Sequence, residues 1–103
     1  MYNLSGLLKD AMRSIEETTV CFYQNKISEG YQRLDDTLVR LSNLMNEIAL
    51  YREQGNEIEI NEREIVTRLT EAMNALEQKD TLLLSDILEY EIKDILAKGY
   101  SSL

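Results

Sequence analysis

Apolar residues recur at alternating steps of three and four along most of the chain, which is the spacing of an amphipathic helix. The clearest run consists of Ile27, Tyr31, Leu34, Leu38, Leu41, Met45 and Ile48, and similar runs begin at Leu4, Ile65 and Leu84. The stripe is wider than a coiled-coil seam and is typical of helices in a globular bundle. The pattern predicts four helices, over residues 3–24, 26–54, 61–78 and 81–98.

Polar caps and glycines mark the ends of these helices. Asn61 is followed three residues later by a glutamate, a capping-box pattern, and Asp80 can cap the fourth helix. Gly55 and Gly99 fall just past the second and fourth stripes, where a left-handed residue commonly closes a helix.

The connections between the helices define the expected fold. Short connections at 24–26 and 78–81 make successive helices antiparallel neighbours, so we expect an all-α, up-down-up-down four-helix bundle that forms a single domain over 1–103. Between the second and third helices, Ile58 and Ile60 are expected to pack onto the core.

The predicted helices differ in length, and this difference suggests a site. At 1.5 Å per residue the second helix would be roughly 43 Å long, and the third and fourth roughly 27 Å each. If the third helix starts beside the end of the second, the tip of the first hairpin is left uncovered. The tip residues are Val20, Cys21, Phe22, Tyr23, Ile27 and Tyr31. They either close the end of the core or form a partner-binding or dimerising patch.

One carboxylate, Glu91, falls inside the apolar stripe of the fourth helix. A buried carboxylate is costly unless it is paired. Arg52 is the expected partner, because the second and fourth helices run parallel in this bundle. Arg63, Arg68 and the hydroxyl of Tyr2 are alternatives, and in each case a structural ion pair or hydrogen bond is favoured over catalysis.

The composition excludes several classes of function. The chain has no histidine and one cysteine, Cys21, so it has no Ser-His-Asp or Cys-His nucleophile and no imidazole metal ligand. We therefore expect no enzymatic activity, no cofactor and no metal. The 19 acidic against 11 basic residues give a net charge of -8, which disfavours nucleic acid and anionic membranes as partners. No targeting or membrane-spanning segment is visible, so a cytoplasmic location is expected.

Two segments carry a resemblance to a known family. The second helix from Tyr31 to Glu47 (YQRLDDTLVRLSNLMNE), and Arg68-Leu69 through Ala75, Lys79 and Asp80 into LLLSDILEYEI, resemble small bacterial flagellar export chaperones. The resemblance implies a short acidic antiparallel bundle. It also implies cytoplasmic capture of an export substrate's helical segment in a hydrophobic groove.

Two functions follow from these observations. The first is a non-enzymatic protein-protein interaction module, a chaperone or adaptor that binds a helical segment of another protein. The alternative is a self-associating structural bundle with no export role, a homodimer whose long hairpins pack together.

Overall fold

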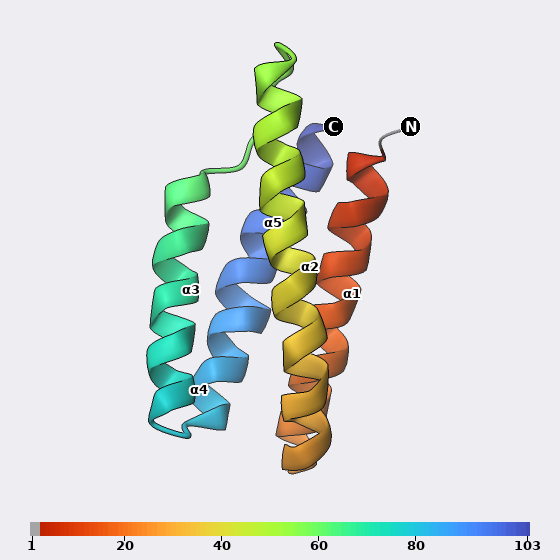
Figure 1. Ribbon diagram of the computed structural model, residues 1–103. Helices are drawn as coiled ribbons and strands as arrows, with labels where there is room; N and C mark the ends of the chain where they lie inside the picture. Colours follow the sequence, from red (N-terminus) through yellow and green to blue (C-terminus); the bar gives the residue numbers. More distant parts are fainter. Residues whose placement is uncertain (1–2) are drawn as a thin grey trace.

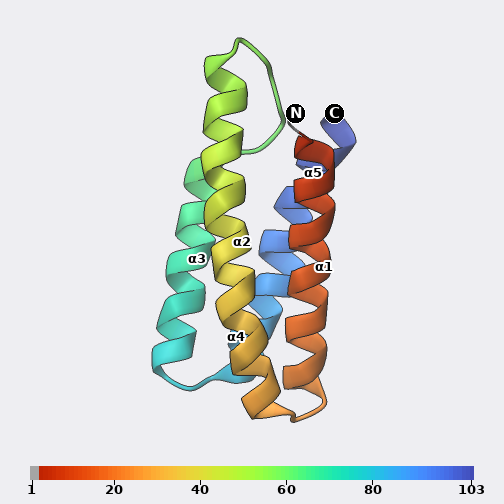
Figure 2. The ribbon, with the colours of Figure 1, turned by 45° about the vertical axis from the view of Figure 1, so that its right-hand side comes forward.

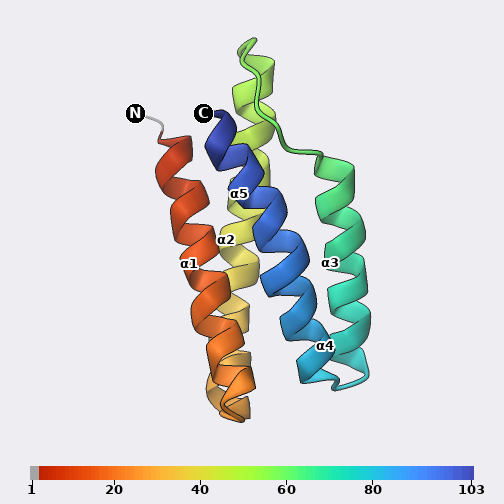
Figure 3. The same cartoon turned by 180° about the vertical axis from the view of Figure 1, so that it is seen from behind.

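The computed structural model describes residues 3–103 and contains an all-α four-helix bundle (Figure 1). The elements are α1 (Leu4–Tyr23), α2 (Ile27–Glu53), α3 (Glu62–Glu77), α4 (Thr81–Asp86), the π-helical turn η1 (Ile87–Ile92) and α5 (Lys93–Ser102). The last three form one continuous rod. Seen from behind, this rod lies between α1 and α3 (Figure 3). The predicted up-down fold is confirmed.

The local signals at the helix ends are also confirmed. The side chains of Asn61 and Asp80 each accept a backbone N–H from the first turn of the helix that follows. Gly55 has a φ of 87°, and Asn25 and Lys79 supply left-handed residues in the two tight turns. None of the helices over 3–103 is long and apolar enough to cross a membrane.

Gly99 has a different role from the one expected. The fourth helix continues to Ser102, so Gly99 lies inside α5 and does not end the helix. A Cβ at Gly99 would lie 2.3 Å from Cγ1 of Ile60, which is far too close. The glycine is therefore needed for close packing of the α2–α3 connection against α5.

That connection is docked onto the bundle. Ile58 and Ile60 are buried, as predicted. The Arg52 guanidinium donates to the backbone oxygens of Ile58, at 3.1 Å, and of Ile60. The segment consequently runs back along the bundle before α3 begins (Figure 2).

The docked connection leaves the C-terminal end of α2 projecting. In Figure 1 the C-terminal end of α2 extends beyond its neighbours, because α3 starts well below it. At the other end the α1–α2 turn also projects past the α3–α4 turn (Figure 3). The short helices therefore do stop before the end of the tip, but α4 contacts the tip through the bond from the Tyr23 hydroxyl to Asp86, so the tip is only partly uncovered.

A buried cluster of hydroxyls joins α1 to α2. Ser14 Oγ and Thr37 Oγ1 are 2.6 Å apart, and Thr18 Oγ1 lies 2.8 Å from Thr37 Oγ1. Thr18 also donates to the backbone oxygen of Ser14. Since Thr37 contacts both Ser14 and Thr18, the cluster fixes the axial register of α2 against α1.

The contact between Gly99 and Ile60 can be tested by substitution. Overpacking a core usually costs about 1–3 kcal/mol, while alanine regains about 1 kcal/mol of helix propensity over glycine. We expect Gly99→Ala to lower the free energy of unfolding by up to about 2 kcal/mol in chemical denaturation. The loss should shrink in an Ile60→Ala background, where space has been made. An equal loss in both backgrounds would contradict the proposed contact.

Candidate protein-interaction site

The structure divides the predicted tip residues into two groups. Cys21 and Phe22 are buried, and the Phe22 ring meets the partly buried Tyr31 edge-on with ring centroids 5.4 Å apart. Val20 and Tyr23 remain 48% and 43% exposed. Ile27 packs against the core from the first turn of α2. The tip thus both closes the core and presents apolar side chains to solvent.

The exposed tip residues lie beside further apolar side chains from the fourth helix. The Tyr23 hydroxyl donates to Asp86 Oδ1 at 2.6 Å. Leu82 and Tyr90 lie four residues before and after Asp86, on the same face, and are 60% and 70% exposed. We call Val20, Tyr23, Leu82 and Tyr90 the tyrosine patch.

Sequence reasoning missed Leu82 and Tyr90 because it did not expect the fourth helix to contact the tip. A signal was nevertheless present. Both residues lie outside the buried stripe of their own helix, as Val20 does in α1. Large apolar side chains on a polar helix face are candidates for contact with a partner.

Burial and the hydrogen bond to Asp86 together raise the pKa of Tyr23 well above its usual range. The charges of Asp86, Tyr90 and Glu89 add to this effect. The phenol therefore stays protonated at neutral pH and acts as a donor. Its ring is held at the tip by a bond across the α1–α4 interface.

A polar network continues this interface above the patch. Lys93 Nζ bonds Glu89 at 2.6 Å and Glu16 at 3.0 Å, and the Thr19 hydroxyl donates to Glu89 at 3.2 Å. The hydrogen bond to Glu89, opposed by desolvation, raises the pKa of Lys93. The network joins α1 to η1 and α5. It leaves the neighbouring Tyr90 exposed on a π-helical turn, a feature frequent at functional sites.

A groove with a volume of 380 Å³ adjoins the patch on the other side of α4. Apolar side chains line it together with acidic ones: Ala75, Leu83 and Ile87, with Glu71, Asp80 and Glu91. Leu83 follows Leu82 directly, so the groove and the patch meet at the start of α4.

The predicted buried pair of Glu91 and Arg52 is wrong. Glu91 Oε1 lies 3.3 Å from Arg68 Nε, with 39% of the glutamate side chain exposed, so the alternative partner Arg68 is the right one. Arg52 instead pairs with Glu62 at 2.9 Å. The docked α2–α3 connection accounts for the difference, because it engages Arg52 at the projecting end of α2. Tyr2 lies outside the described residues.

Over residues 3–103 no group of three or more His, Cys, Asp or Glu side chains could hold a metal ion. The patch offers apolar side chains, the phenol of Tyr23, which is held by its bond to Asp86, and the exposed phenol of Tyr90. Apolar side chains and phenols are enriched in the cores of protein interfaces.

Comparison with known proteins identifies a family. Residues 1–98 match a domain of unknown function, DUF8042. The chain belongs to this family. No curated protein and no solved structure matches. The DUF8042 assignment covers all four helices up to the last turn of α5, and with it every residue of the tyrosine patch.

The bond between Tyr23 and Asp86 predicts a pH effect. Because the pKa of Tyr23 is raised above the unfolded value of 10.0, its contribution to stability is present below pH 10 and is lost as the pH rises further. Ultraviolet titration, with the Tyr23→Phe spectrum subtracted, should show Tyr23 ionising well above the unfolded value of 10.0. Asp86→Asn should lower its pKa. An unchanged titration in Asp86→Asn would contradict the bond.

Proposed function

We propose that this DUF8042 protein is a non-enzymatic protein-interaction module that binds a helical segment of a partner through the tyrosine patch. The observation that carries the proposal is the exposure of Leu82 and Tyr90, at 60% and 70%, beside the exposed Val20 and Tyr23. Helical spacing places these four large apolar side chains, from two helices, around the bond between Tyr23 and Asp86. Such surfaces on small domains commonly mark interaction sites.

The residue types suit this function. Tyrosine is enriched among the residues that dominate binding energy, because it combines apolar area with a polar tip. The ring of Tyr23 is already held by its bond to Asp86. Less side-chain entropy is therefore lost when a partner covers it.

The charges around the patch favour a basic partner segment. The adjoining α3–α4 groove carries Glu71, Asp80 and Glu91 around its apolar residues. The whole chain has a net charge of -8. An amphipathic helix with apolar residues on one face and Lys or Arg at its edges complements such a surface.

The resemblance to flagellar export chaperones supports the same mode of binding. In the specific form of the proposal, the chain acts as a cytoplasmic chaperone or adaptor for an export substrate. The patch and groove would then cover an amphipathic helix of the substrate before export. This role needs no catalytic group.

The test uses the purified chain as bait. A partner is captured from a lysate of the source organism, identified, purified and titrated against the chain and its variants. Leu82→Glu and Tyr90→Glu should each weaken binding by about tenfold or more, since a buried charge replaces an apolar anchor. Val66→Glu is the matched control, because Val66 is 53% exposed on α3 and lies outside the patch.

Two results would contradict the proposal. One is a partner that binds the patch variants as tightly as the parent chain. The other is a partner that is lost equally with Val66→Glu, which would place the contact elsewhere. Circular dichroism of each variant checks that the helices are intact.

A further inference from the structure

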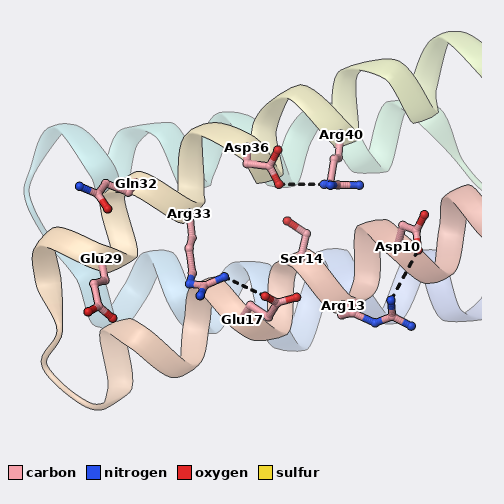
Figure 4. Close-up of a pocket in the computed structure, with 9 residues that line it drawn as sticks. All are labelled: Asp10, Arg13, Ser14, Glu17, Glu29, Gln32, Arg33, Asp36 and Arg40. Carbon is pink, nitrogen blue, oxygen red and sulfur yellow. Dashed lines mark hydrogen bonds and ion pairs between the residues drawn. The ribbon is translucent and has the colours of Figure 1, made fainter.

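A second surface, between α1 and α2, is lined almost wholly by charged side chains (Figure 4). It is an open groove with a volume of 660 Å³. Six of its seven charged residues lie in the central part of the groove, Asp10, Arg13 and Glu17 from α1 and Arg33, Asp36 and Arg40 from α2, and the seventh, Glu29, lies at the end near the hairpin turn. This groove is separate from the tyrosine patch, and the inference drawn from it does not rest on the proposed function.

The buried hydroxyl cluster sets the register of these charges. The Thr37 hydroxyl lies 2.6 Å from that of Ser14 and 2.8 Å from that of Thr18, so Thr37 is level with the middle of that turn of α1. The two helices are antiparallel. Each step toward the C-terminus of α2 therefore matches a step toward the N-terminus of α1.

This register places like charges at the same level on the two helices. Arg40 is level with Arg13, which forms an arginine band. Asp36 is level with Glu17, which forms an acidic band. The bands are four residues apart on each helix, or about 6 Å along the axis.

Two further charges flank the bands. Asp10 lies three residues beyond the arginine band, and Arg33 lies three residues beyond the acidic band, each at about 4.5 Å. The order along the groove is therefore acid, arginine band, acidic band, arginine. Over these four levels, the order read from the opposite end has the opposite sign at every level, with the same spacings. Glu29 lies outside them, four residues beyond Arg33 toward the hairpin turn.

We propose that this face binds a second copy of the chain in antiparallel orientation, about a two-fold axis perpendicular to the helices. The arginine band of each copy then meets the acidic band of the other. A parallel arrangement would instead bring like bands together and is disfavoured. An antiparallel pair of this kind is isologous, so both copies use the same surface.

Net charge supports a second copy as the occupant. Four acidic and three basic side chains line the groove, which gives a net charge of -1. The chain carries -8, so -7 lies on the rest of the molecule. Because this face is nearly neutral, two chains that meet through it repel each other less than two chains that meet through the more acidic rest of the surface.

Ion pairs within each chain hold the side chains along the groove. Arg33 bonds Glu17 and Arg40 bonds Asp36, each at 2.8 Å. Exposed pairs of this kind contribute little stability on their own. In the dimer each group gains a second neighbour of opposite charge, and the pairs become one network across the interface.

The geometry keeps the tyrosine patches accessible. The patch lies at the tip of the hairpin, on the side of α1 that faces α4. In an antiparallel dimer the two tips point in opposite directions. A dimer would therefore present two separate patches, one at each end.

Charge reversal tests the proposal by sedimentation. One variant carries Arg13→Glu with Arg40→Glu, and the other carries Glu17→Arg with Asp36→Arg. Each alone presents two bands of the same sign and should be monomeric. An equimolar mixture should form a heterodimer, because every band then meets its opposite. The control Arg63→Glu with Lys98→Glu changes the net charge by the same amount as the first variant and should still dimerise.

Salt dependence provides a second readout. The dissociation constant of the parent dimer should rise at least about tenfold between about 0.1 M and 1 M salt, as the Debye length falls from about 10 to about 3 Å. A parent chain that is monomeric throughout would overturn the proposal. So would variants that dimerise like the parent, or folded variants whose mixture stays monomeric.

Discussion

The packing of α1 against α2 around the hydroxyls of Ser14, Thr18 and Thr37 is the interaction on which the other features depend. A buried polar cluster contributes little net stability, but it penalises any register that leaves its groups unpaired. Over residues 3–103 every buried side-chain nitrogen and oxygen has a partner. The register held by these hydroxyls closes Phe22 over Gly30 at the tip and aligns the charges along the outer groove.

The second pair of helices is positioned by a different contact. Arg52 binds the α2–α3 connection, and Ile60 packs against Gly99 where no side chain would fit. The connection therefore runs back along the bundle, and α4 lies beside the tip of the first hairpin. The tyrosine patch exists because of this placement, since it brings Tyr23 of α1 beside Asp86 and Tyr90 of the fourth helix. Two helix pairs, each held by its own contacts, thus create two separate surfaces.

The sequence alone predicts the features that depend on local spacing. The four helices, the caps at Asn61 and Asp80, and the burial of Ile58 and Ile60 follow from periodicity and side-chain chemistry. Features that depend on distant contacts were not predicted. Leu82 and Tyr90 join the patch, and Glu91 pairs with Arg68 and not Arg52, because of where the connection docks. The charge bands require the register of two helices, which no single stripe encodes.

The most direct test of this account is a double-mutant cycle between Ser14→Ala and Thr37→Val, measured as the free energy of unfolding in chemical denaturation. Valine has nearly the shape of threonine, so Thr37→Val mainly removes the hydroxyl. If the cluster holds α1 to α2, the two substitutions should be coupled by about 1 kcal/mol or more. If the losses of unfolding free energy in the two single variants simply add in the double variant, the claim that these hydroxyls fix the register of the hairpin is contradicted.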